Sequence, residues 1–256
     1  MKKVVFLSLL AASVAFVSCK ETSQDPQTTP EVKDLAIAET AINTPNETYL
    51  YVTAATGLSL REYNNLSSEK LAIMPYGTKV QVITAEEKPT MTVGGIKGGM
   101  HEVSYNHKKG YAFNGYLSRF FPPEEDIKPA IYAEDLKGQF PKVIFTETTG
   151  GTASKPSNTE TLILPNATWH EGYFISQKLF KIPREFTFPS HKGKTIQKIK
   201  NPKPSSRVWK SELDIERKDK ELQKIEYSHA SEGFGYTVTI TQDGDNIKLE
   251  RTEIVE

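Results

Sequence analysis

Gly235-Tyr-Thr-Val-Thr-Ile-Thr241 sets the fold class of this chain of 256 residues. Polar and apolar residues alternate along it, and they alternate again in Asn246-Ile-Lys-Leu-Glu-Arg-Thr252. A period of two is typical of β-strands with one buried face. Asp243-Gly244-Asp245 lies between the two runs and predicts a hairpin turn. Together with Glu221–His229, these runs predict a three-stranded antiparallel meander. Its shared apolar face would hold Tyr236, Val238, Ile240, Ile247 and Leu249.

The rest of the region from 130 to 256 also favours strands over helices. Candidate strands cover Lys142–Thr146, Glu160–Leu164, Tyr173–Phe180 and Arg207–Ile215. The glycine- and serine-rich segment Gly150–Asn158 predicts a mobile loop. We therefore expect residues 130–256 to form a mainly antiparallel β domain. No motif in it identifies a family.

A second set of short strands is expected between residues 46 and 121. Turns are predicted at Pro75–Thr78 and Asn106–Gly110. Short strands joined by tight turns suit a small barrel that closes its own edges. The expected strands are Tyr49–Val52, Gly57–Arg61, Lys79–Ile83, Met100–Tyr105 and Tyr111–Phe113. The whole chain is thus expected to be all-β.

Three blocks in this first region carry a family resemblance. They are Tyr51–Ala54 with Gly57-Leu-Ser-Leu-Arg61, then Met74-Pro-Tyr-Gly-Thr-Lys-Val80, then Gly110-Tyr-Ala-Phe-Asn-Gly-Tyr-Leu-Ser118. In this order they resemble the bacterial SH3-like (SH3b) domain. The resemblance implies a small β-barrel that binds cell-wall peptide or a protein, and it covers residues 46–121.

The N-terminus has the pattern of a secretory signal. Met1-Lys2-Lys3 is basic, Val4–Val17 is uncharged, and Phe16-Val17-Ser18 leads to Cys19, the single cysteine of the chain. The apolar run is too short to span a bilayer of about 30 Å. The ending resembles the lipobox of bacterial lipoproteins. This resemblance implies that residues 1–18 are removed and that Cys19 is acylated. Lys20 after the cysteine favours the outer membrane by the same analogy.

Two segments read as connections. Residues 19–45 are rich in Thr, Glu, Pro and Gln, a composition that buries too little apolar surface to offset ordering entropy. We expect them to form a lipidated tether. Residues 122–129 begin with a proline pair and an acidic run, which predicts a linker between the barrel and the C-terminal domain.

Composition and motifs argue against several activities. The chain holds 32 basic and 32 acidic residues, so no overall charge favours nucleic acid. Acylation of Cys19 leaves no thiol nucleophile, the five histidines lack HExxH spacing, and no GxSxG motif is present. The Gly94–Gly99 segment is expected to form a hairpin connection. We expect neither cofactor nor metal, and no catalytic residue.

Two groups of residues are candidates for binding. Tyr63, Tyr105, Tyr111 and Tyr116 would line a shallow groove on the barrel, because tyrosine gives a large contact area with a polar tip. The alternative for Tyr111 and Tyr116 is barrel packing. Residues 178–210 hold ten Lys or Arg against one acid. Lys192, Lys194, Lys198 and Lys200 would dock an anionic partner. The favoured alternative is that the lysines neutralise the acidic run that follows.

These patterns favour a non-catalytic, lipid-anchored protein of the cell envelope. Its SH3-like domain would bind cell-wall peptide or an envelope or host protein. Two alternatives stay open: a structural or inhibitory envelope lipoprotein, and an envelope enzyme whose site lies in residues 130–256.

Overall fold

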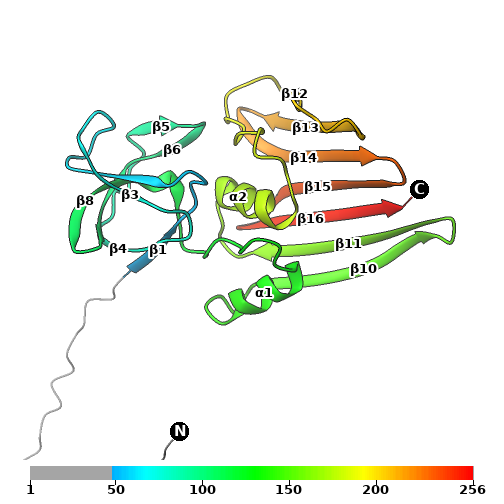
Figure 1. Ribbon diagram of the computed structural model, residues 1–256, viewed down its shortest axis with the longest axis horizontal. Coiled ribbons are helices and arrows are strands. Elements are labelled where there is room, and N and C mark those ends of the chain that lie inside the picture. The colour runs from blue at the N-terminus through cyan, green and yellow to red at the C-terminus, as the bar shows by residue number, and fades with distance from the viewer. Residues whose placement is uncertain (1–47, 256) are drawn as a thin grey trace, which may run out of the picture. The chain divides into compact units, whose positions relative to one another are not determined.

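A computed structural model describes residues 48–255, and for residues 254 and 255 it describes the backbone alone. The predicted signal peptide (1–18), the predicted acylation site Cys19 and the predicted tether (19–45) lie outside the described residues. Residues 48–255 belong to one compact unit. They contain two seven-stranded antiparallel sheets and few helices (Figure 1), so the all-β prediction is confirmed.

The first sheet has the strand order β3-β2-β8-β7-β4-β1-β9. Its strands bury one face, which includes Val52, Leu60, Val80, Val103 and Phe113. A separate two-stranded hairpin, β5 (Met91–Val93) and β6 (Ile96–Gly98), turns through Gly94 and Gly95, as expected. The strands of the sheet are β1 (Thr48–Val52), β2 (Leu58–Arg61), β3 (Lys70–Met74), β4 (Lys79–Thr84), β7 (Met100–Tyr105), β8 (Lys108–Phe113) and β9 (Leu117–Ser118), with a 3-10 turn η1 (Asn114–Tyr116) before β9.

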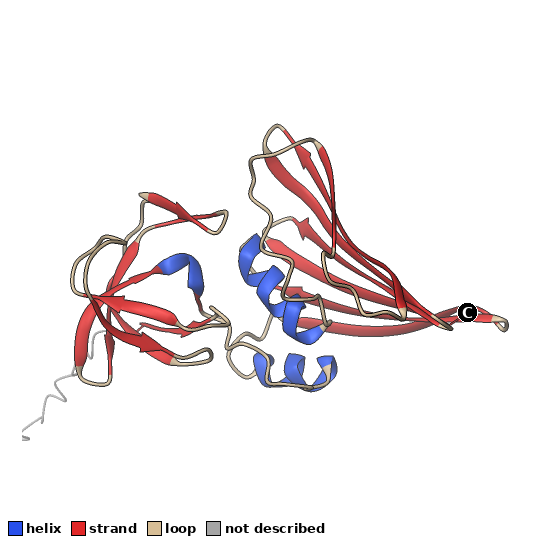
Figure 2. Cartoon of the chain, turned by 45° about the horizontal axis from the view of Figure 1, so that its top comes forward, coloured by secondary structure: helices blue, strands red, loops and turns tan. Residues whose placement is uncertain are grey.

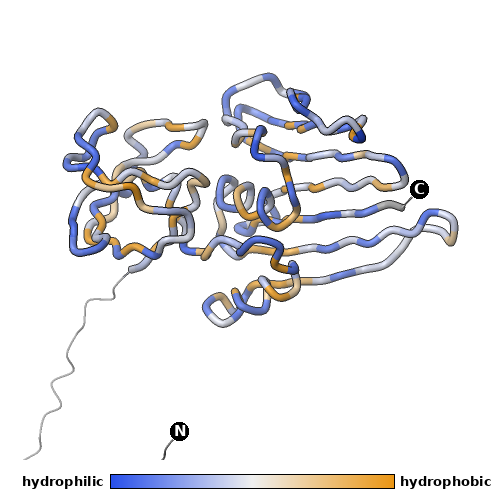
Figure 3. The backbone as a smooth tube through the Cα atoms, in the orientation of Figure 1, coloured by the Kyte–Doolittle hydropathy of each residue, from blue (hydrophilic) through white to orange (hydrophobic). Residues whose placement is uncertain are grey.

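The second sheet has the order β10-β11-β16-β15-β14-β13-β12. Its C-terminal meander is confirmed: Ile240 pairs with Leu249, and Tyr236, Val238, Ile247 and Leu249 are buried. Figure 3 shows the accompanying changes between hydrophobic and hydrophilic residues along the strands. The strands are β10 (Ile144–Thr152), β11 (Lys155–Leu164), β12 (Ile196–Lys200), β13 (Val208–Lys218), β14 (Glu221–Ser231), β15 (Phe234–Asp243) and β16 (Asn246–Val255).

The strand predicted at Tyr173–Phe180 is wrong, because this segment lies in helix α2 (Trp169–Leu179). Thr168 and Glu171 form a reciprocal capping box at its start. Tyr173, Ser176 and Leu179 recur at helical spacing and are buried. The aromatic and β-branched residues favour a strand locally, but the cap and the apolar helical face decide the outcome.

A second helix was not expected from the sequence. Helix α1 (Pro129–Lys137) begins with proline at its first position, where the missing N–H costs no hydrogen bond. It buries Tyr132, Ala133 and Leu136. Both helices lie on the same face of the second sheet (Figure 2). They cover part of its apolar surface.

The mobile loop predicted at Gly150–Asn158 is also wrong. These residues form the end of β10 and the start of β11, paired from Gly150 with Ser157 to Thr152 with Lys155. Only Ala153 and Ser154 remain for the turn. Gly151 has φ +81°, a conformation that glycine adopts without steric cost.

The two sheet regions share buried contacts. The Ser118 hydroxyl at the end of β9 donates to the Glu171 carboxylate on α2, with 2.7 Å between the oxygens. The rings of Phe120 and Phe140 lie 4.6 Å apart, and those of Tyr116 and Phe174 lie 5.7 Å apart. The Ser118–Glu171 bond and the Tyr116–Phe174 contact hold α2 against the end of the first sheet, and the Phe120–Phe140 contact joins the segment after β9 to the segment after α1.

Candidate functional site

A groove of about 700 Å³ opens beside this junction. Its size is that of a typical ligand site. Residues of β1, the β3–β4 turn, the segment before α1, and both helices line it. We call it the aromatic–acidic groove and define it by Tyr51, Tyr76, Phe121, Glu124, Glu125, Ile131, Asp135 and Lys178.

Packing fixes the aromatic wall of the groove. The Tyr51 ring meets Phe121 edge-on at 6.1 Å, and Phe121 meets Tyr132 edge-on at 5.5 Å. The Tyr132 hydroxyl also donates to the Phe121 carbonyl oxygen at 2.8 Å. Phe121 is thereby held from two sides, so the wall exists before any ligand arrives. A preformed wall lowers the ordering cost of binding.

Tyr76 lies in the β3–β4 turn and presents a neutral phenol to the groove. Burial raises the pKa of Tyr76 to about 12, Arg184 opposes this shift and Glu125 adds to it. The Lys178 ammonium lies 5.5 Å from the centre of the Tyr76 ring. Tyr76 therefore offers a ring face and a hydroxyl donor at neutral pH.

The charge of the groove is mainly acidic. Glu125 forms an ion pair with Lys178, and the hydrogen bond from that lysine holds the pKa of Glu125 below its usual range. Within residues 48–255, no lysine or arginine forms an ion pair with Glu124 or Asp135. Exposed Ile131 lies between these groups and adds apolar surface. The groove thus combines aromatic rings with carboxylates that have no cationic partner.

None of the four tyrosines predicted to bind ligand lines this groove. Tyr63 is 59% exposed in the β2–β3 loop, whereas Tyr105 and Tyr111 are half-buried and pack against the core. Tyr116 packs between Phe113 and Phe174. Tyr116 also lines a cavity of about 320 Å³ beside the β1–β2 turn. The structure therefore distributes these side chains and does not gather them.

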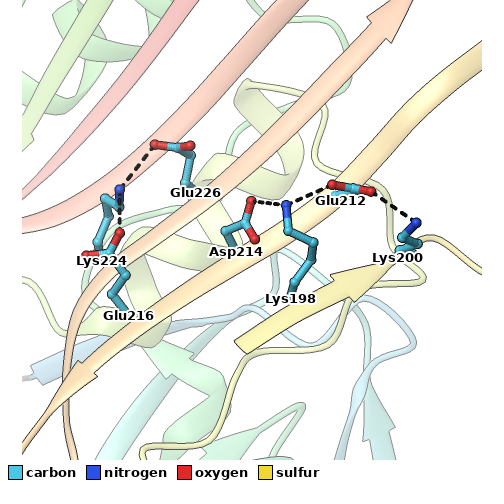
Figure 4. A network of polar contacts seen from close by, with 7 residues as sticks. All are labelled: Lys198, Lys200, Glu212, Asp214, Glu216, Lys224 and Glu226. Atoms are coloured by element: carbon cyan, nitrogen blue, oxygen red, sulfur yellow. Dashed lines mark hydrogen bonds and ion pairs between the residues drawn. The ribbon is translucent and has the colours of Figure 1, made fainter. Parts of the chain in front are cut away.

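The predicted basic patch divides into two parts. Lys198 on β12 contacts Glu212 at 2.9 Å and Asp214 at 3.0 Å on β13, and Lys200 lies 3.6 Å from Glu212 (Figure 4). Register explains this, because β12 pairs antiparallel with β13. The acidic run that follows therefore neutralises Lys198 and Lys200, which is the alternative favoured from the sequence. Lys192 and Lys194 precede β12, are exposed, and form no ion pair within the described chain.

A polar cluster on the second sheet was missed by sequence reasoning. Arg251 on β16 pairs with Glu253 and, at 3.7 Å, with Glu160. Its guanidinium lies 4.6 Å from the Tyr236 ring, which stacks on His229 at 4.8 Å. Arg251 and Glu253 lie two residues apart on β16, but Glu160, His229 and Tyr236 reach this cluster only through strand pairing, so no linear motif reveals it. Within residues 48–255, no group of three or more His, Cys, Asp or Glu is arranged to hold a metal ion.

This cluster gives a pH-dependent prediction for Glu160→Gln. Burial raises the pKa of Glu160 above the usual 4.5, although Arg251 opposes the shift. A carboxyl with a raised pKa binds its proton more tightly in the folded state. It therefore stabilises the fold below pH 4.5 and loses that contribution as pH rises through its folded pKa. We expect wild type to gain stability over Glu160→Gln as pH falls from neutral toward 4.5, measured by denaturant unfolding at both ends. Loss of relative stability on acidification would show that the Arg251 pair dominates instead.

Comparison with known proteins adds little. No family model matches the chain, and no curated protein matches it. A solved structure, CalU16 from Micromonospora echinospora, aligns at 12% identity over 44% of this chain and 70% of that one, with a TM-score of 0.21. In the described part of the chain, no helix is long and apolar enough to cross a membrane.

Proposed function

We propose that this chain is a non-catalytic, lipid-anchored binding protein of the cell envelope, held on the outer membrane by acylated Cys19. Residues 46–121 act as an SH3-like domain, and residues 19–45 act as the tether. The aromatic–acidic groove is the ligand site. The ligand is an extended peptide segment that carries amines, from the cell wall or from an envelope or host protein.

The groove is the observation that carries this proposal. Aromatic rings with polar tips give contact area at low rotamer cost, which suits peptide binding. Tyr51 and Tyr76 provide two such rings, and Phe121 adds a third ring without a polar tip. Glu124 and Asp135 lack cationic partners among residues 48–255, so a ligand amine would supply the missing charge. Lys178 is already bound to Glu125 and competes little for them.

A titration with two synthetic peptides tests the ligand class. Ac-Ala-Lys-Ala-Lys-Ala-amide and its glutamate counterpart share length and backbone but differ in charge sign. With the acylated chain in mild detergent, we expect saturable binding of the lysine peptide. We also expect at least tenfold weaker binding of the glutamate peptide, a difference of about 1.4 kcal/mol. Equal affinities, or none for either peptide, would remove the basis for an amine-binding groove.

The anchor has its own test, through Cys19→Ser. Two or three acyl chains at about 0.8 kcal/mol per buried CH₂ hold a protein stably on a membrane. We expect the wild-type chain to enter the detergent phase of a temperature-induced partition and Cys19→Ser to stay in the aqueous phase. A wild-type chain that is aqueous, with residues 1–18 retained by intact mass, would refute the anchor.

A further inference from the structure

Within residues 48–255, Arg217 near the end of β13 is buried without a carboxylate partner. The residue is 5% exposed. Nε and Nη2 donate to the Ser190 carbonyl oxygen at 2.9 and 2.7 Å, and Nη1 donates to the Lys194 carbonyl and to Gln197 at 3.0 and 3.1 Å. All of these acceptors are neutral. A buried charge is costly unless an opposite charge compensates it.

Among the described residues, the hydrogen bonds of Arg217 leave one of its N–H donors without an acceptor. A guanidinium carries five N–H groups, and four of those of Arg217 have acceptors in the structure. The remaining N–H belongs to Nη2. Burial lowers the pKa of Arg217, and no carboxylate opposes this shift. The side chain nevertheless stays charged, because the pKa of arginine lies far above neutral.

A polar cavity of about 320 Å³ lies beside this guanidinium. It is lined by Gly94 and Gly95 of the β5–β6 turn, Thr187, Lys192, Gln197 and Arg217. A neighbouring cavity of about 220 Å³ brings Lys97 and His191 close, together with one acid, Glu221. Burial lowers the pKa of His191, and Lys97, Lys192 and Arg217 add to this while Glu221 opposes it. The positive charges of Lys97, Lys192 and Arg217 therefore lie close to these two cavities.

At two glycines, neighbouring atoms approach the backbone closely beside this cavity. A Cβ on Gly95 would lie 3.1 Å from the Phe188 carbonyl oxygen and 3.2 Å from Ser190. A Cβ on Gly193 would lie 3.0 Å from the Arg217 guanidinium carbon. Both close approaches are possible because glycine has no side chain. The loop 187–197 is thus folded closely around Arg217.

We propose that this cavity binds a phosphate-type oxyanion, bonded by the unused N–H of Arg217 and by the Lys192 ammonium. Arginine and phosphate form strong, directional hydrogen bonds, and a dianion would compensate the buried guanidinium. The same chemistry fits free phosphate and the phosphomonoester headgroup of a lipid. The site is separate from the aromatic–acidic groove and stands whether or not that groove binds peptide.

Calorimetric titration of the acylated chain with inorganic phosphate, at about 0.15 M ionic strength, tests the proposal. Screening over about 8 Å then limits distant charges. We expect saturable binding of phosphate and none of acetate. Dihexanoyl phosphatidic acid, against dihexanoyl phosphatidylcholine, distinguishes the source. Binding of the phosphatidic acid in addition indicates a lipid headgroup, and binding of phosphate alone indicates the free anion.

Variants that add a negative charge to the cavity lining locate the binding. We expect Lys192→Glu and Thr187→Glu each to weaken phosphate binding at least tenfold. Lys203→Glu is the matched control, since it makes the same charge change at an exposed lysine outside the cavity lining. It should change the affinity less than twofold. Equal losses in Lys192→Glu and Lys203→Glu, or no saturable binding up to about 10 mM phosphate, would overturn the proposal.

Discussion

Glu171→Ala is expected to lower the free energy of unfolding by about 3 kcal/mol, as the sum of lost charged hydrogen bonds and a lost helix cap. Glu171 is 8% exposed at the start of α2. One carboxylate oxygen accepts from the Ser118 hydroxyl at 2.7 Å. The other accepts from the Thr168 N–H at 2.8 Å and the Thr168 hydroxyl at 2.9 Å. Alanine leaves the buried Ser118 hydroxyl without this acceptor and removes the cap from the exposed Thr168 donors.

Denaturant unfolding measures this loss, and two variants frame it. Glu134→Ala removes an exposed glutamate of α1 whose partner is Lys137, so it should cost under about 0.5 kcal/mol. Glu171→Gln keeps the shape and one acceptor oxygen, and an intermediate loss is expected. If Glu171→Ala cost no more than Glu134→Ala, the junction between α2 and the first sheet would not depend on this carboxylate.

Tyr76→Ala is expected to weaken binding of the lysine peptide at least tenfold, or by about 1.4 kcal/mol. The substitution removes the ring and the neutral phenol donor from the lining of the aromatic–acidic groove. Tyr76→Phe keeps the ring and should lose less. The measurement is the same peptide titration, with thermal unfolding of each variant to confirm that it folds.

Tyr63→Ala is the matched control for this prediction. It removes a tyrosine from the same sheet region, but Tyr63 lies in the exposed β2–β3 loop and does not line the groove. We expect its affinity to stay within twofold of wild type. The opposite result, loss in Tyr63→Ala and none in Tyr76→Ala, would favour the tyrosine set expected from the sequence.

Local alternation predicted most strands because a half-buried strand leaves a direct trace in sequence. Tyr236, Val238 and Ile240 show this in β15. Helix α2 was not predicted because Tyr173, Phe174 and Ile175 favour strands by propensity. Thr168 and Glu171 carried the contrary signal, a serine- or threonine-type cap followed three residues later by glutamate.

The candidate site was less predictable because its residues meet only in the fold. Tyr76 lies in a turn that sequence identified, and Phe121 ends the expected barrel, yet neither position indicates a ligand. Asp135 and Lys178 reach the groove from two helices that sequence did not predict. The ion pairs of Lys198 likewise depend on strand register, since Glu212 and Asp214 lie across the β12–β13 pair.

Photo-crosslinking tests the aromatic–acidic groove most directly as the ligand site. A lysine peptide with a diazirine at its central residue is bound to the full chain and irradiated, and the adducts are mapped by mass spectrometry. Adducts are expected at Tyr51, Tyr76 or Ile131, and excess unlabelled lysine peptide should suppress them. Ile144, whose exposure of 50% matches the 52% of Ile131, should stay unlabelled. Labelling centred on Tyr63 and Tyr111, or on residues 192–217, would contradict the proposed site.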